Sequence, residues 1–247
     1  GASPLETFFR NPERAGAARQ EALTPMKLPL AIISLAAFAV AQTGIAGSAH
    51  DFSGASWNNQ AGHKPGEVCG VCHIPHVEGR PASRTTHATL WAREDSAVTS
   101  YTMYFGYGIN GTFDPQPSGS SGLCLGCHDG SVALEMFGSF TGTGTNFIDV
   151  SEQVPGLNGG TDFSSDHPIS ITYADDPLGE YDENLRPRTS GYAGKTIADF
   201  LEGGKVQCKT CHDVHNVDTA PGAASLLVIK NDDPLNPSAL CRACHIK

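Results

Sequence analysis

The chain contains the pentapeptide Cys-x-x-Cys-His four times, and these four copies use all eight of its cysteines. This pentapeptide is typical of covalent haem attachment, because two thiols three positions apart bond to the two vinyl groups of one porphyrin. The histidine that follows then places an imidazole under the iron. We therefore predict four c-type haems, held by Cys69, Cys72 and His73; Cys124, Cys127 and His128; Cys208, Cys211 and His212; and Cys241, Cys244 and His245.

Other uses of paired cysteines fit this pattern less well. Exported proteins often pair cysteines as disulfides, and Cys-x-x-Cys pairs also build zinc sites and redox dithiols. None of these needs a histidine directly after the second cysteine. A disulfide or zinc framework would have to acquire that histidine four times by coincidence, so haem attachment is the favoured interpretation.

The supply of histidines predicts the second axial ligand of each iron. The chain has ten histidines and only three methionines. Six histidines lie outside the motifs, namely His50, His63, His76, His87, His167 and His215. Four second axial positions are therefore open to imidazoles, and we expect bis-His iron throughout, with lower potentials than His/Met iron.

His76 and His215 each follow a motif histidine by three positions, in CGVCHIPH and CKTCHDVH. This spacing is too short for the second imidazole to reach the opposite face of the same porphyrin. Each should therefore bind a different iron, so that each segment contacts two haems and keeps them close together.

The other histidines outside the motifs are distinguished by their neighbours. We expect His167 to be a ligand, with Asp166 orienting its imidazole or accepting the proton of Nδ1. His50 lies near the start of the secreted part. His63 and His87 have polar or Gly- and Pro-rich neighbours, which favours solvated loops for both.

The first 41 residues indicate export. Met26 and Lys27 precede an apolar run from 28 to 40. This run is shorter than the roughly 20 residues of a membrane-spanning helix. The small residues at 39 and 41 fit a signal-peptidase cleavage site. We expect an upstream extension over 1–25, a signal peptide over 26–41 and one secreted tetrahaem domain over 42–247, without a membrane span. The net charge of −10 argues against nucleic acid or anionic lipid as partners.

The composition predicts a loop-rich fold. The chain has 28 Gly, 16 Pro and 39% hydrophobic residues, so its apolar core would be thin for 247 residues. We expect a multihaem cytochrome c fold with few short helices and little strand, organised around four haems that replace the missing core.

Local signals place a few elements in this fold. Asn236 as N-cap and Pro237 at the first helical position predict a helix over the last motif, and 196–202 predicts a second helix that ends at Gly203 and Gly204. A strand is expected over 169–173. The acidic run from Asp175 to Glu183 lacks EF-hand spacing, which favours a solvated loop over a calcium site.

The motifs and their flanks resemble the multihaem c-type cytochromes of metal-reducing bacteria, in particular the OmcE-like tetrahaem cytochromes that form extracellular filaments. The resemblance follows the same order along nearly all of the secreted part. It rests on His-Asp-Phe-Ser from His50, Cys-x-x-Cys-His-x-Pro-His from Cys69, Leu-Cys-Leu-Gly-Cys-His-Asp-Gly from Leu123, Asp-His-Pro-Ile from Asp166, Cys-x-x-Cys-His-Asp-Val-His from Cys208 and Ala-Leu-Cys-x-x-Cys-His from Ala239.

The resemblance implies an electron-transfer protein rather than an enzyme. Identical subunits would stack into an extracellular filament that carries electrons to other redox proteins, minerals or electrodes. It implies that His50 ligates a haem of the neighbouring subunit, while His76, His167 and His215 bind within the chain. The family often has Leu-Trp-Asn-His where this chain has Leu-Trp-Ala-Arg, from Leu90 to Arg93. If that family histidine has a role, His87 is its substitute here.

Two other functions use the same haems. A soluble periplasmic shuttle would take all four second ligands from one chain, which the six spare histidines permit. A multihaem reductase would need an iron with an open position. No motif departs from Cys-x-x-Cys-His to mark such an iron, so we favour electron transfer.

Overall fold

The computed structural model describes residues 44–59, 66–74, 90–104, 109–138, 143–156, 160–176, 180–181, 183–220 and 223–246. The expected extension over 1–25 and the signal peptide over 26–41 lie outside these residues, as do His63, His76 and His87. None of the helices in the described ranges has the length and apolar character needed to cross a membrane.

Short helices carry three of the four motifs. The motifs at Cys124, Cys208 and Cys241 lie on α1 (Gly119–His128), α3 (Cys208–Cys211) and α4 (Ala239–Cys244). The remaining helical elements of the described ranges are α2 (Ile197–Phe200), η1 (Phe52–Gly54), η2 (Ser56–Asn59), η3 (Val150–Glu152) and η4 (Ala224–Leu226).

Strands in the described residues are only two residues long and pair two by two, always antiparallel. The pairs are β1 (Ile171–Thr172) with β6 (Lys205–Val206), β2 (Asp175–Asp176) with β3 (Glu180–Tyr181), and β4 (Gly191–Tyr192) with β5 (Lys195–Thr196). The described part of the chain is therefore loop-rich, with few short helices and little strand.

The expected elements are present but shorter than predicted. The helix over the last motif is confirmed, but its predicted start at Asn236 is wrong, because Ser238 is left-handed (φ 60°) and the helix begins at Ala239. The Asn236 side chain accepts a hydrogen bond from Arg242 instead of capping the helix. The expected strand over 169–173 contains β1, which is limited to the residues opposite β6.

The second predicted helix starts as expected and ends early. Thr196 and Asp199 form a capping box at the start of α2, with the Asp199 carboxylate accepting hydrogen bonds from the Thr196 amide and hydroxyl. The helix stops at Phe200, because Leu201 is extended. Gly203 and Gly204 both have positive φ and turn the chain into β6 rather than capping α2.

Buried apolar side chains form three small clusters instead of one core, and residues of three motifs belong to them. Val71 of the first motif, Leu125 of the second and Cys244 of the fourth each pack in a different cluster. The clusters consist of Trp57, Val71, Ala92 and Phe137; Tyr101, Tyr104, Leu125 and Phe163; and Tyr173, Tyr192, Ile197, Phe200 and Val228. The thin core expected from composition is thus divided among the motifs.

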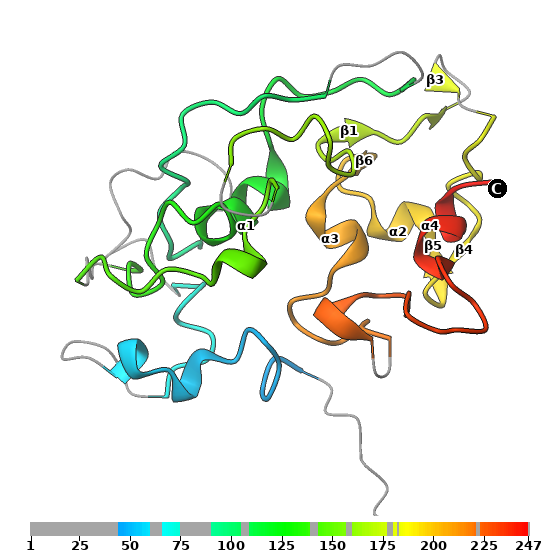
Figure 1. Cartoon of the computed structure of the whole chain (residues 1–247). Coiled ribbons are helices and arrows are strands. Elements are labelled where there is room, and N and C mark those ends of the chain that lie inside the picture. The colour runs from blue at the N-terminus through cyan, green and yellow to red at the C-terminus, as the bar shows by residue number, and fades with distance from the viewer. Residues whose placement is uncertain are drawn as a thin grey trace, which may run out of the picture. The chain divides into compact units, whose positions relative to one another are not determined.

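A buried polar network joins the second motif to the third. α1 and α3 lie side by side, as Figure 1 shows near the middle of the ribbon. The Gln207 side chain, which is 2% exposed, accepts hydrogen bonds from the hydroxyls of Ser121 at 2.6 Å and Ser170 at 3.0 Å. The Ser121 hydroxyl also accepts the Cys208 amide at 3.0 Å. Because a buried polar group without a partner is costly, this network constrains how the two motifs meet.

Candidate haem-binding sites

Three of the four motif histidines lie opposite a histidine from outside the motifs. The ring centroids are 6.0 Å apart for His50 and His128, 6.2 Å for His73 and His215, and 6.3 Å for His167 and His245. In every pair one imidazole follows a cysteine pair and the other comes from a remote segment. The structure therefore brings together six of the eight histidines predicted as iron ligands.

These spacings fit an iron held between the two rings. Two metal–nitrogen bonds of about 2 Å, plus about 1.1 Å from each nitrogen to its ring centre, would separate two axial imidazoles by about 6.2 Å. The interplanar angles are 40°, 15° and 77°. Rotation about the axis through the iron leaves the centroid spacing unchanged, so all three angles are compatible with axial ligation. The residues present thus fit bis-His haem at three sites.

Backbone carbonyls orient three of the imidazoles. Nδ1 lies 2.8 Å from the Glu152 carbonyl oxygen in His128, 2.7 Å from that of Ser225 in His212, and 3.1 Å from that of Pro168 in His167. A carbonyl oxygen only accepts, so Nδ1 carries the proton in each of these rings. Nε2 is then the nitrogen with a free lone pair, which is the form that binds a metal.

The segment after the third motif turns sharply at Asp213. Its carboxylate accepts hydrogen bonds from the amides of His215 at 3.0 Å and of Val217 and Asp218 at 2.6 Å each. Such turns are a local property of aspartate. The turn directs His215 to the ring of His73 in the first motif. This is the arrangement that the spacing argument requires, although the assignment as an iron ligand stays a prediction.

The imidazole of His167 is hydrogen-bonded to a backbone carbonyl and not to the carboxylate of Asp166. Asp166 does not accept its Nδ1 proton, which goes to the Pro168 carbonyl, and the Oδ2 atom of Asp166 is buried without a partner among the described residues. Of the two expected roles of Asp166, accepting this proton is therefore wrong. The carbonyl of the next residue, Pro168, takes that role.

His50 is half-buried within its own chain. Burial, with smaller effects of His128, His212 and His215, lowers its pKa to about 4, and its Nδ1 is buried without a hydrogen-bond partner among the described residues. The Gly44 amide donates to the Asn216 carbonyl at 3.0 Å and holds this segment in place. The resemblance assigned His50 to a haem of the neighbouring subunit, whereas in the structure it lies opposite His128 of the same chain.

The third motif has no such partner among the described residues. His212 contacts the Ser225 carbonyl, and no described histidine lies opposite its ring. His76 is the remaining member of the predicted ligand set, and it lies outside the described residues. The pairings seen for the other three motifs leave His212 and His76 as the fourth predicted pair.

Cysteines of successive motifs lie close together. The pKa of Cys72 is raised to about 11, mainly by burial, and Cys127 of the second motif adds to this effect. A hydrogen bond between the Cys124 and Cys208 thiols raises the pKa of Cys124 and lowers that of Cys208.

The same holds for the third and fourth motifs. Burial, followed by the effect of Cys211, raises the pKa of Cys244 to about 11. Cysteines of the first and second, the second and third, and the third and fourth motifs are thus near enough to influence one another.

A buried arginine lies between the first two motifs. The Arg93 side chain is 2% exposed and donates to the carbonyls of Leu134 at 3.0 Å and Ala133 at 3.1 Å. Its positive charge lowers the pKa values of Cys72 and Cys127 against the effect of burial. It forms no ion pair with a described carboxylate. From the sequence, Arg93 is recognisable only as a departure from the family pattern. Its buried position between the first two motifs could not be predicted.

In the described ranges no group of three or more His, Cys, Asp or Glu side chains converges. In the acidic run from Asp175 to Glu183, Asp175 and Asp176 pair through their backbones with Glu180 and Tyr181 as β2 and β3. The eight cysteines form no disulfide.

Comparison of the chain with known protein families gave no matching family. Comparison with curated proteins gave no similar sequence.

Proposed function

We propose that this protein is a tetrahaem c-type cytochrome that transfers electrons between four bis-His haems and does not transform a substrate. The observation that carries this proposal is the set of three imidazole pairs with centroids 6.0 to 6.3 Å apart, each joining a motif histidine to a remote one. Bound haem supplies one-electron redox chemistry.

The chain's own residues would hold each site in one geometry. Carbonyls fix the rings of His128, His167 and His212 through Nδ1, which keeps Nε2 in place for the metal. Two imidazoles per iron leave no position for a substrate, so a site of this kind favours electron transfer over reduction of a bound oxyanion. Ligand identity, hydrogen bonding and burial then set the potentials.

The order of the motifs in space supports transfer along the molecule. Cysteines of the first and second, second and third, and third and fourth motifs influence each other's pKa. Haems bonded to these sulfurs would follow one another in the same order. The electron path would therefore run from the first motif to the fourth, or in the reverse direction.

The proposal extends to a secreted filament of identical subunits that passes electrons to other redox proteins, minerals or electrodes outside the cell. The resemblance of the motif flanks supports this extension. A shared ligand is not required, because His50 lies opposite His128 within one chain. Contacts between subunit surfaces would then hold the filament together.

A second candidate function is a soluble periplasmic electron shuttle. The same pairing of His50 with His128 favours it, because a chain that completes its own ligand pairs is able to work as a monomer. Haem count and assembly state are the measurements that test these alternatives. A pyridine haemochrome assay should give four haems per chain, and fewer than four would contradict the tetrahaem proposal. Electron microscopy should show filaments, whereas discrete particles of one chain would favour the shuttle.

A further inference from the structure

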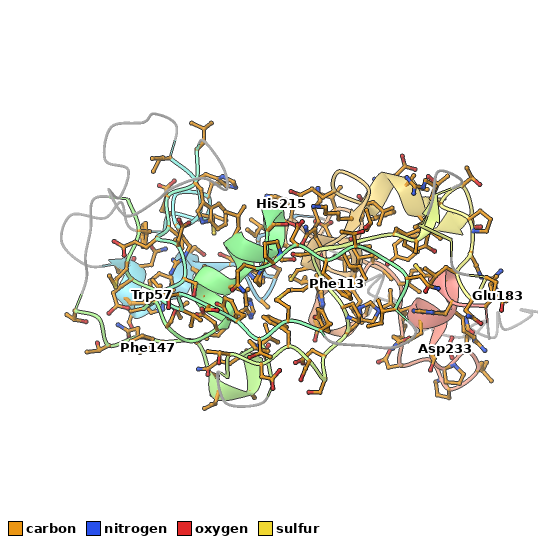
Figure 2. The ribbon with its side chains drawn as sticks, turned by 90° about the horizontal axis from the view of Figure 1, so that it is seen from above. Trp57, Phe113, Phe147, Glu183, His215 and Asp233 are labelled. Carbon is orange, nitrogen blue, oxygen red and sulfur yellow. The ribbon has the colours of Figure 1, made fainter. Side chains whose placement is uncertain are left out.

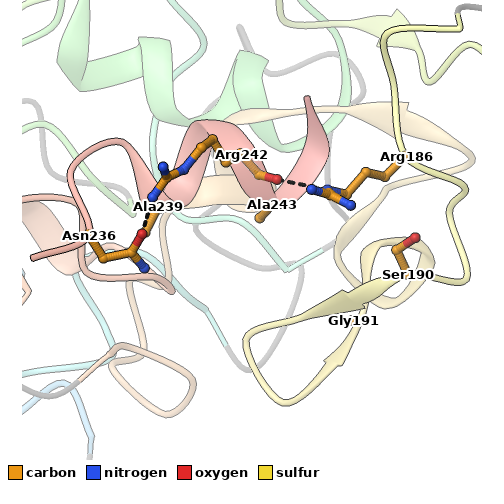
Figure 3. Close-up of a pocket in the computed structure, with 7 residues that line it drawn as sticks. All are labelled: Arg186, Ser190, Gly191, Asn236, Ala239, Arg242 and Ala243. Carbon is orange, nitrogen blue, oxygen red and sulfur yellow. Dashed lines mark hydrogen bonds between the residues drawn. The ribbon is translucent and has the colours of Figure 1, made fainter. Parts of the chain in front are cut away.

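A pocket of about 340 Å³ adjoins the fourth motif. Figure 3 shows Arg242 on α4 and Arg186 on the neighbouring loop at its edge, with the Arg186 Nε donating to the Arg242 carbonyl at 2.9 Å. Ser190 and Asn236 add a hydroxyl and an amide to the lining. The pocket is therefore a concave polar surface with two guanidinium groups.

These two arginines differ from the other exposed cations that the structure describes. Four lysines each pair with a carboxylate of their own chain, in the pairs Lys195 with Asp218, Lys205 with Asp114, Lys209 with Glu202 and Lys230 with Asp232. Arg186 and Arg242 form no ion pair with any described carboxylate. Arginine binds carboxylates through two parallel hydrogen bonds, so two arginines without an ion pair predict a carboxylate ligand.

Apolar side chains flank the pocket along the chain. Leu235, next to Asn236, is 94% exposed, and Ile246, two residues beyond the end of α4, is 48% exposed. Large exposed apolar residues beside charged ones are typical of protein contact surfaces. This combination favours a protein segment with carboxylates and apolar side chains over a small free anion.

The chain itself presents a segment of that kind. Phe147, Val150 and Val154 are 46%, 50% and 39% exposed, and the carboxylates of Asp149 and Glu152 lie on exposed residues between them. No Lys or Arg occurs from Glu94 to Leu185, so no cation in this part of the sequence opposes the carboxylates. We call residues 147–154 the acidic segment.

The pocket and the acidic segment are different surfaces of the same chain. Figure 2 places Phe147 of the acidic segment and Asp233, near Leu235, at opposite ends of the view. A contact between two different surfaces joins subunits head to tail. The first subunit then keeps one of the two surfaces free and the last subunit keeps the other, so further subunits are able to add. Repetition of such a contact builds a filament rather than a closed dimer.

We propose that the Arg186–Arg242 pocket binds the acidic segment of a second copy of this chain, with Asp149 and Glu152 as the carboxylates. This inference rests on the proposed filament and names its contact. The Glu152 carbonyl holds the ring of His128, so the contact would bring the second motif of one subunit to the fourth motif of the next.

The test uses the haem-loaded full chain and charge reversal. R186E/R242E should raise the protein concentration needed for assembly at least about tenfold, because like charges then face each other. D149K/E152K should do the same. The chain that carries all four changes should assemble again, because the charges are opposite once more. K195E/K230E is the matched control, since these lysines already pair within the chain, and it should assemble as the wild type does.

The outcomes are read by sedimentation and electron microscopy, with haem content measured for each variant. Wild-type filaments that persist in R186E/R242E would overturn this contact and leave the filament proposal standing. Failure of the fourfold variant to assemble, with its haem content unchanged, would show that the acidic segment is not the occupant. A wild-type chain that stays monomeric would overturn both the filament and the contact.

Discussion

His215 lies opposite His73, with ring centroids 6.2 Å apart and planes inclined by 15°, although the two histidines belong to segments of different motifs. The Asp213 carboxylate accepts hydrogen bonds from the backbone amides of His215 and Val217, and these bonds hold the turn after the third motif that directs His215 to His73. The segment from Cys208 to His215 would thus contribute to two of the proposed haem sites, one through each of its histidines.

His215→Ala should free one axial position of the haem at the first motif. We expect part of the iron to become high-spin and to bind carbon monoxide when reduced, while the haem count stays at four because all thioethers remain. His63→Ala is the control and should stay low-spin, because His63 is not among the predicted ligands. A fully low-spin spectrum of His215→Ala would show that His215 is not a ligand.

Replacing Arg93 should change reduction potentials. Ferric haem carries one more positive charge than ferrous haem, so a buried cation nearby favours the reduced form. Arg93→Met should therefore lower the potential of the haem at the first or second motif. We expect at least a tenfold change in the reduction equilibrium, which is about 59 mV for one electron.

Spectroelectrochemical titration measures the effect of Arg93. Arg93→Lys keeps the charge and should keep most of the potential. Lys209→Met, which removes an exposed cation inside the third motif, is the control and should change the potentials little because water screens it. Equal shifts in Arg93→Lys and Arg93→Met would mean that packing, rather than charge, explains the effect.

The buried network at Gln207 should be needed for stability. Gln207→Ala leaves the hydroxyls of Ser121 and Ser170 without their acceptor, and buried polar groups without partners cost about 1–3 kcal/mol each. We expect the haem-loaded variant to unfold at lower denaturant concentration. Gln116→Ala, at a less buried position, should cost less. If the two variants are equally stable, the network does not fix how the motifs meet.

Glu135 should make stability depend on acid pH. Its side chain is fully buried, and although burial alone would raise the pKa, hydrogen bonds from Thr145, Asn146 and Thr143 hold it at about 2. The folded pKa is thus below the unfolded value of 4.5. The stabilisation is present above pH 4.5 and is lost as the pH falls towards 2.

Glu135→Gln tests this dependence. At pH 7 we expect a loss of about 1–3 kcal/mol in the free energy of unfolding, because the hydrogen bonds no longer reach a charged acceptor. The difference from the wild type should shrink between pH 5 and pH 3, as measured by denaturant unfolding of the haem-loaded protein. A difference that stays constant with pH would mean that the carboxylate is protonated in the folded state.

Local patterns predicted much of this protein. The four motifs, the loop-rich character and the helix over Cys241 to Cys244 follow from short stretches of sequence. The position of His215 away from His212 also follows locally, because three residues are too few to cross a porphyrin. Asp213 supplies the turn that this position needs.

Long-range packing could not be read from the sequence. Nothing near His50 in the sequence indicates that its ring lies opposite that of His128 in the same chain. His167 donates its Nδ1 proton to the Pro168 carbonyl rather than to Asp166. The sequence could not predict this contact, because every residue has a backbone oxygen. Arg93 is buried by segments around Ala133 and Leu134, which are distant from it along the chain.

A high-resolution density map of the native, haem-loaded protein tests the central claim most directly. We predict one iron between His73 and His215, with both rings coordinated, and equivalent irons between His50 and His128 and between His167 and His245. A map with His215 away from the first motif's iron, or with no porphyrin attached to Cys69 and Cys72, would contradict the account.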